Sequence, residues 1–477
     1  MNRKALSLLT ASSAALLLAA CAVGPKAPDP TVPVQGQGAF IGAQSASVST
    51  EAARADWWRL YNDATLDGLI QQALTENNEL EAAAANLRAV RASLSEARAG
   101  RLPSTNANAA FNRSQASAAT LQPGTPRPEI DTYSVGLDVA YEVDLFGRVE
   151  STVRAARADA DAAAEALEVV RITVAAETAR AYADTCSANA QIAVAERTID
   201  LQSKTVDLTQ RLLDGGSGNG LDVARARAAL EQTRASLPPL RAQRDGALYR
   251  LATLTGRTPA EASEAARGCQ SPPQLSQPIP VGDGAALLAR RPDVRQAEAR
   301  LAAAAARVNV ATASLYPSIS LGGSLGSTAL DSSGLGDDAN FRFSVGPLIS
   351  WNFPNIAVAR ARIKQAGALT DAALATFDQT VLTALQETET ALSAYANELD
   401  RRTALRTARD QAATAARLSR LRFDAGADSF LTVLDSERTL AGADAALAAS
   451  EAQVTTYQIA LFKALAGGWD QAPDPEA

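Results

Sequence analysis

Residues 132–146 read TYSVGLDVAYEVDLF. Apolar side chains alternate along this stretch with small or charged ones, and a period of two is the geometry of a strand. A second stretch, FRFSVGPLISWNF at 341–353, alternates in the same way. Weaker strands are predicted near 104–113 and 318–328, so we expect four strands in the chain.

The two strong strands have the length and the ends of membrane strands. Crossing a bilayer takes about 9–11 residues in a tilted strand. Aromatic side chains at the strand ends suit the belts found at membrane interfaces. They are Tyr133, Tyr141, Phe341, Trp351 and Phe353. A half-buried sheet of a soluble sandwich would alternate similarly and is the alternative, but the length favours the membrane.

Long helices follow the strong strands. Small or apolar residues recur every three or four positions, which is the seam of a coiled coil. The run from 149 to 213, taken as one helix, would be about 98 Å long at 1.5 Å per residue. The seam positions are Val149, Val153, Ala156, Ala160, Ala163, Leu167, Val170 and Val174, then Phe377, Val381, Leu385, Thr388, Leu392, Tyr395 and Leu399.

The same order of sequence motifs occurs twice along the chain. RLPS at 101–104 corresponds to LYPS at 315–318, and Gly216 corresponds to Gly426. The separation stays near 210 residues, which indicates an internal duplication. The predicted domains are a signal peptide 1–20, a lipidated arm 21–55 that resembles a tether, a first repeat 56–260, a linker 261–284, a second repeat 285–468 and a tail 469–477.

The composition excludes several classes of function. The 477 residues carry a net charge of -7 and no basic tract, so nucleic acid is not an expected partner. Histidine is absent, which removes the commonest general base and metal ligand. We therefore expect no catalytic site, no metal site and no cofactor, and we predict that the protein is not an enzyme.

The N-terminus has the features of an export signal. Arg3 and Lys4 precede an uncharged apolar stretch that is too short for a convincing membrane span. Leu18-Ala19-Ala20-Cys21 resembles the lipobox of bacterial lipoproteins, in which the signal is cut before an acylated cysteine. That resemblance implies palmitate on Cys21, and Ala22 in place of aspartate implies the outer membrane. An ordinary cleavage site with an accidental cysteine is the alternative.

Two cysteines remain after Cys21. Cys186 lies in a helical run and Cys269 in a proline-rich loop, and two cysteines define no disulfide framework. We expect both to be free thiols without a catalytic or metal-binding role.

Four strands per chain require several copies in a membrane. Outer strands would expose unpaired N–H and C=O groups to hydrocarbon, so a barrel must close. Two chains would give eight strands, whose interior side chains fill. Three chains would give twelve strands and leave a water-filled lumen. Such a lumen suits the polar residues Asp138, Glu142, Asp144 and Arg342. The expected fold is a mixed α+β membrane protein with a trimeric channel.

Several motifs resemble the lipoprotein branch of the TolC-like outer-membrane factors, the NodT or OprM group. The resemblance covers nearly the whole chain, from Cys21 to Trp469. The motifs are DWWRLYND at 56–63, DLFGR at 144–148, RRPDVR at 290–295, YPSISL at 316–321 and ALAGGW at 464–469.

The resemblance implies a homotrimer in the outer membrane, with a twelve-stranded transmembrane β-barrel and a coiled-coil helical barrel that crosses the periplasm. It implies docking to a periplasmic adaptor (a membrane fusion protein) and to an inner-membrane pump of the RND class. The function it implies is passive export of drugs and other small toxic compounds.

A glycine-rich stretch, GGSGNG at 215–220, invites comparison with a phosphate-binding loop. It lacks the Gly-Lys-Ser/Thr ending and a preceding strand, so a turn between two antiparallel helices is the better interpretation. The resemblance implies that this turn, at Gly216, and its counterpart at Gly426 are the periplasmic tips that contact adaptors.

The resemblance also implies a gate of aspartates beyond each turn. Asp222 and Asp435 match family positions, whereas Thr432 stands where another aspartate is common. Asp428 stands where the family often has an arginine that holds the gate closed, so the contacts that close the gate differ here from the family pattern. Arg225 is a candidate countercharge for the aspartates. Aspartates at the start of a helix are also favoured by the macrodipole alone, which is the alternative.

Other functions remain as alternatives. The outer-membrane component of a type I protein secretion system would share the fold. A lipid-anchored periplasmic coiled-coil scaffold would not need membrane-length strands, and an exported hydrolase lacks a nucleophile–base pair. Pro238-Pro239 predicts a break in a helix and has no expected functional role.

Overall fold

The computed structural model describes residues 24–25, 28, 30–120, 122, 124, 126–275, 277–351, 353–354 and 356–465. The predicted signal peptide, Cys21, Trp469 and the tail lie outside the described residues. Predictions that concern them therefore stay predictions.

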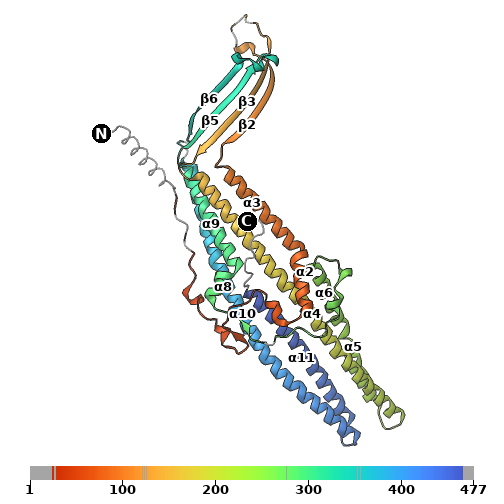
Figure 1. The fold of residues 1–477 in the computed structure, drawn as a ribbon. Coiled ribbons are helices and arrows are strands. Elements are labelled where there is room, and N and C mark those ends of the chain that lie inside the picture. The colour runs from red at the N-terminus through yellow and green to blue at the C-terminus, as the bar shows by residue number, and fades with distance from the viewer. Residues whose placement is uncertain are drawn as a thin grey trace. The chain divides into compact units, whose positions relative to one another are not determined.

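The chain is mostly helical and contains one principal sheet (Figure 1). It divides into two compact units. The first contains Asn86–Ala163 and Gln296–Phe377 besides the start of the chain, and it holds the principal sheet. The second contains Thr31–Ala85, Ala164–Arg295 and the chain from Asp378 onward.

The two repeats have matching elements. The first consists of α2 (Ala64–Glu76), α3 (Asn78–Ala99), β2 (Ser104–Gln115), β3 (Glu129–Val143), α4 (Arg148–Asp214), α5 (Gly220–Arg234) and α6 (Leu237–Leu254). The second consists of α8 (Gly284–Arg290), α9 (Pro292–Ala313), β5 (Ser318–Ala329), β6 (Phe341–Ser350), α10 (Ile356–Asp424) and α11 (Phe430–Ala464). The helix α7 (Glu264–Arg267) lies between them. The elements follow the same order in both repeats, except that α5 and α6 together stand where the second repeat has the single helix α11.

All four predicted strands are present in one antiparallel sheet, in the order β2-β3-β5-β6. The prediction placed the end of β3 at 146, three residues too late. The chain leaves the strand there because the Asp144 carboxylate accepts hydrogen bonds from the backbone N–H groups of Val149 (3.0 Å) and Glu150 (2.7 Å). Asp144 therefore caps α4 and is not a polar residue of the sheet, which corrects the prediction.

The predicted long helix is confirmed. α4 contains 67 residues and its counterpart α10 contains 69. Several predicted seam positions are buried, among them Val153 and Val174 in α4 and Phe377 and Leu392 in α10. No described helix combines the length and the apolarity that a membrane-spanning helix requires.

The predicted proline break is confirmed between α5 and α6. Pro238 and Pro239 lie in the first turn of α6, where the backbone N–H groups have no partner within the helix. A proline further along would remove an intrahelical hydrogen bond, so α5 ends at Arg234 and a new helix begins.

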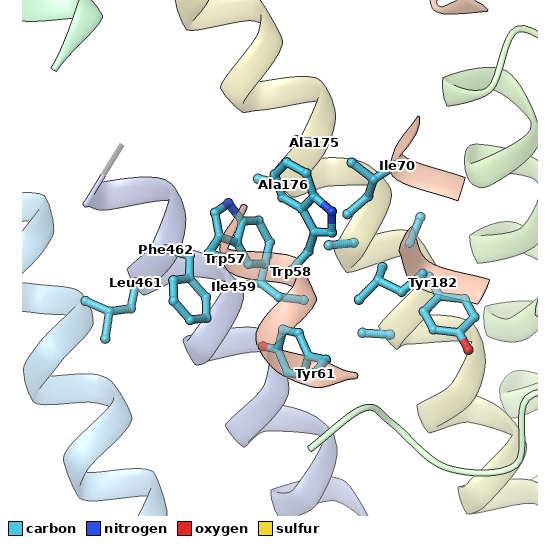
Figure 2. Close-up of a cluster of buried hydrophobic side chains, with 14 of the residues drawn as sticks. Trp57, Trp58, Tyr61, Ile70, Ala175, Ala176, Tyr182, Ile459, Leu461 and Phe462 are labelled. Atoms are coloured by element: carbon cyan, nitrogen blue, oxygen red, sulfur yellow. The ribbon is translucent and has the colours of Figure 1, made fainter. Parts of the chain in front are cut away.

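The core of the second unit is built around the DWWRLYND motif (Figure 2). Trp57 stacks on Phe462 of α11 with ring centroids 4.7 Å apart. The Tyr61 hydroxyl donates to Gln458 Oε1 (3.2 Å), and Gln458 Nε2 donates to the Tyr395 hydroxyl (3.2 Å). The buried polar groups are thus paired, as a dry core requires.

Two arginines of the RRPD motif at 290–293 bind the C-terminal end of α11. Arg290 Nε donates to the carbonyl oxygen of Leu465 (3.0 Å), and Arg291 donates to that of Ala464 (2.8 Å). The last carbonyls of a helix lack intrahelical partners and carry partial negative charge, so two guanidinium groups stabilise this terminus.

The predicted tether is partly folded, which corrects that expectation. β1 (Val48–Ser49) pairs in parallel with β4 (Ile279–Pro280) of the linker. Phe40 and Val48 are buried in the core of the second unit. Polar composition suggested an extended arm, but the segment also holds to the core through hydrogen bonds from the backbone N–H groups of Ile41 and Gly42 to the Glu389 carboxylate (2.6 and 3.0 Å).

The expectation of free thiols is wrong. Cys186 of α4 and Cys269 form a disulfide across 83 residues of sequence. Asn189 Nδ2 holds the same loop by donating to the carbonyl oxygens of Arg267 (3.0 Å) and Cys269 (2.8 Å). Such a bond is compatible with the export that the sequence predicts, because disulfides persist in oxidising compartments outside the cytosol.

Candidate functional site

The sheet of the first unit has one apolar face. Residues directly opposite each other on paired strands point to the same side, so the register defines the two faces. The apolar face is exposed within one chain, and Phe343 and Val345 have exposed fractions of 75% and 73%. Its members are Phe111, Tyr133, Val135, Leu137, Val139, Tyr141, Val143, Ile319, Leu321, Leu325, Phe341, Phe343, Val345 and Ile349.

The opposite face is polar and internally hydrogen-bonded. Asn108 Nδ2 donates to Asp138 Oδ2 (2.8 Å) across β2 and β3. The hydroxyl groups of Ser324 and Ser344 lie 2.8 Å apart across β5 and β6. The face also carries the predicted residues Glu142 and Arg342, while Leu348 departs from the pattern. One sheet thus offers one face suited to lipid and one suited to water.

Both edges of this sheet are open. Among the described residues, β2 pairs only with β3, and β6 pairs only with β5. Almost every residue of the two edge strands is exposed. An open edge of this length is a template for pairing with another strand.

The predicted glycine turns are confirmed at the ends of the two longest helices. Gly216 and Gly426 both have φ +74°, the left-handed region that glycine adopts most readily. Ser217 N–H donates to the Leu212 carbonyl oxygen (2.9 Å), and Ala427 N–H donates to that of Arg422 (2.8 Å). Both turns therefore end a helix with the same six-residue hydrogen-bonded closure.

Asp222 takes part in the cap of α5. Its backbone N–H donates to Asn219 Oδ1 (2.9 Å), and Asn219 Nδ2 donates back to Asp222 Oδ2 (2.8 Å). The predicted countercharge Arg225 lies one turn later, 3.8 Å from the same carboxylate. The geometry is that of a helix-start acid, the alternative role that the sequence left open.

The other two candidate gate residues also have arginine partners. Arg422 binds the Asp428 carboxylate at both oxygens (2.7 and 3.1 Å), and this hydrogen bonding holds the pKa of Asp428 below its ordinary 3.8. Arg438 lies 3.2 Å from Asp435. Neither arginine partner was predicted from the sequence. The pairing of Arg422 with Asp428 could have been, because the glycine turn at Gly426 brings residues six positions apart together.

A buried polar cluster near the second turn was also missed. Glu437 of α11 is 5% exposed and accepts hydrogen bonds from Arg420 of α10 (2.7 Å) and Thr205 of α4 (2.9 Å). Arg420 also donates to the Thr205 hydroxyl (3.1 Å). The cluster ties the helix hairpin of the first repeat to that of the second.

No group of three or more His, Cys, Asp or Glu side chains among the described residues is arranged to hold a metal ion. The features that the sequence predictions single out, and that the structure places, are the amphipathic sheet and the two glycine turns.

The comparisons with known proteins agree with this geometry. The family model described as "Outer membrane efflux protein" matches residues 69–257 and 285–467, one segment in each repeat. The chain belongs to this family. The predicted resemblance to TolC-like outer-membrane factors is thereby confirmed.

Relatives of this outer membrane efflux protein match it nearly end to end. Outer membrane protein OprJ of Pseudomonas aeruginosa is 33% identical over 460 residues, covering 96% of this chain and 95% of the relative. The solvent efflux pump outer membrane protein SrpC of Pseudomonas putida is 31% identical, covering 96% and 97%.

Solved structures of outer-membrane channels share the fold. The outer-membrane channel OprN superimposes with a TM-score of 0.87 at 36% identity, covering 94% of this chain and 100% of OprN. The outer membrane protein VceC of Vibrio cholerae gives a TM-score of 0.80 at 26% identity, covering 88% and 100%. This efflux protein is therefore an outer-membrane protein with the fold of these channels.

Proposed function

We propose that this protein is the outer-membrane duct of a tripartite efflux system of the RND type. Three copies close a twelve-stranded β-barrel, which continues into a helical barrel in the periplasm. The observation that carries the proposal is the amphipathic sheet, whose edge strands have no partner strand among the described residues. In hydrocarbon, free backbone N–H and C=O groups are costly, so the edges must pair with other copies.

The number of copies follows from what the polar face needs. Each copy supplies four strands. Eight strands give a barrel filled by its own side chains, whereas twelve give a wider interior. Charged side chains such as Asp138 and Glu142 suit a wet lumen better than a packed one. In this proposal the repeats are 56–260 and 285–468, joined by the linker 261–284.

The duct supplies neither chemistry nor energy, so its partners must. We assign adaptor contact to the tips at Gly216 and Gly426, because each presents a well-defined turn at the end of a very long helix. An inner-membrane pump drives export through the duct. The name of the relative SrpC supports solvents and other small toxic compounds as cargo.

The gate is assigned to Asp222, Asp428 and Asp435. Around a threefold axis these carboxylates form rings, which attract cations. The arginine partners found within each chain reduce the net charge of such rings. We therefore expect moderate cation selectivity.

Planar-bilayer conductance tests the duct and the gate together. Wild type should conduct and prefer cations, and a trivalent cation added at the periplasmic side should block it. The double variant Asp222→Ala/Asp435→Ala should lose selectivity and block. Asp200→Ala is the control, since this exposed carboxylate pairs with Lys204 farther along α4. A double variant that behaves as wild type would leave these aspartates as helix-start charges.

The lipid anchor is assigned to Cys21, which lies outside the described residues. Cys21→Ser should abolish incorporation of labelled palmitate, while Cys269→Ser should not. The barrel face provides an independent anchor, so Cys21→Ser should still reach the outer membrane. Undiminished labelling of Cys21→Ser would remove the lipoprotein assignment.

A further inference from the structure

The first turns of α10 carry uncompensated positive charge. Arg360, Arg362 and Lys364 are all exposed, and no acidic residue lies in the first turn of the helix. None of the three pairs with a carboxylate among the residues that the structure describes. The N-terminal end of a helix itself carries partial positive charge, so cations near it are unfavourable unless an anion compensates them.

The corresponding helix of the first repeat is compensated. The turns at Gly216 and Gly426 are equivalent, and counting back from them makes Arg360 the counterpart of Glu150. Glu150 lies in the first turn of α4 and pairs with Arg101. The second repeat thus has a base where the first has an acid. The positive charge of α10 is therefore not a requirement for starting a helix at this end of the sheet.

The helix α10 begins directly after the aromatic end of β6. Trp351 and Phe353 continue the alternation of the apolar face, and both rings are exposed, with their centroids 4.9 Å apart. Aromatic residues in this position mark the membrane interface. Arg360 lies about 6 Å along the helix from Ile356, and the interfacial layer extends about 5–8 Å beyond the hydrocarbon. Arg360 is therefore at the depth of the lipid headgroups.

The two sides of α10 have different surroundings. Arg362 lines a cavity of about 350 Å³ together with Glu142 and Ser350, which belong to the polar face of the sheet. Arg360 and Lys364 lie about 160–200° away from Arg362 around the helix, and about 40° from each other. These two bases therefore share the side of α10 that faces away from the polar face and toward the lipid.

The spacing of the two bases suits a phosphate. Side chains four residues apart on a helix begin about 5–6 Å from each other, so one phosphate can accept hydrogen bonds from both. The planar guanidinium of Arg360 can bind two phosphate oxygens at once, whereas the ammonium of Lys364 acts as a point charge. The flexible stem of Lys364 allows its head to reach the interface from one turn deeper.

We propose that Arg360 and Lys364 bind the phosphate of an anionic phospholipid in the periplasmic leaflet of the outer membrane. The headgroup supplies the negative charge that α10 lacks, at the depth where the aromatic end of β6 meets the interface. The inference rests on the proposed function, because it takes the apolar face of the sheet as the wall that faces lipid.

Native mass spectrometry of the full-length protein in detergent, titrated with dioleoylphosphatidylglycerol, counts the lipids bound to each assembly. Wild type should bind this anionic lipid saturably. Arg360→Gln/Lys364→Gln should weaken the binding about 10- to 30-fold, the loss expected for two basic residues near an anionic surface. Zwitterionic dioleoylphosphatidylcholine should bind weakly, and equally to wild type and to the double variant.

Three variants control for charge and for position. Arg362→Gln removes a cation from the opposite side of the same helix and should bind the anionic lipid as wild type does. Arg197→Gln/Arg417→Gln removes two exposed cations from parts of α4 and α10 that lie tens of residues from the sheet, and it should also have no effect. Arg360→Lys/Lys364→Arg keeps both charges and should retain the binding.

Three results would overturn the proposal. Equal affinity of wild type and Arg360→Gln/Lys364→Gln for phosphatidylglycerol would remove the lipid contact. Displacement of the lipid by millimolar glycerol 1-phosphate would identify a site for soluble anions. Dissociation of the double variant into single chains in lipid-free detergent would show that the two bases pair with a neighbouring copy. The same spectra give the copy number, which tests the duct, so the duct and the lipid contact can fail separately.

Discussion

The buried cluster at Glu437 sets how firmly the two helix hairpins hold together. Glu437→Ala removes the hydrogen bonds from Arg420 and Thr205 and leaves the guanidinium without its carboxylate. Breaking a fully buried pair costs about 3–5 kcal/mol. The Arg420 side chain is 27% exposed and regains water, so we expect a loss of about 2–3 kcal/mol. That loss favours local separation of the helices by about 30- to 150-fold.

Native-state hydrogen exchange measures this separation directly. Amides of α11 near residue 437 and of α4 near residue 205 should exchange about 30- to 150-fold faster in Glu437→Ala, while amides of α6 should not change. Asp435→Ala is the control, because its ion pair is exposed and contributes little. Equal exchange near 437 in the two variants would refute the idea that the buried cluster joins the hairpins.

Three further predictions concern other parts of the chain. Cys269→Ala should lower the free energy of unfolding by about 2–4 kcal/mol, and mass spectrometry of unreduced wild type should find the peptides of Cys186 and Cys269 linked. The pKa of Asp428 is lowered by its arginine, so the stabilisation of the second turn is present above about pH 4 and is lost as pH falls through the lowered pKa. Exchange in that turn should therefore rise at acid pH in wild type, whereas Asp428→Asn should exchange fast at neutral pH too. Val345→Arg, on the apolar face, should impair membrane insertion by about 2–4 kcal/mol, while Ala110→Arg on the polar face should not; equal insertion would contradict the assignment of faces.

Local periodicity made the strands and long helices predictable. Alternation along 132–146 and 341–353 places every second side chain on one face, and pairing in register preserves that order across the sheet. The ends of α4 and α10 were equally visible, because glycine is the residue that the left-handed closing position requires.

Contacts between distant segments were not predictable in this way. Nothing near Cys186 indicates Cys269, since 83 residues separate them and only the folded core brings them together. Glu437 has the residue type of an exposed helical position, and its burial depends on Arg420 and Thr205 from two other helices.

The copy number of the solubilised protein tests whether three chains share one barrel. Native mass spectrometry in several mild detergents should give three copies of the lipidated chain, because the open edges of β2 and β6 must pair with neighbouring copies to close a barrel. A single copy in every detergent, with the protein folded, would contradict the trimeric barrel.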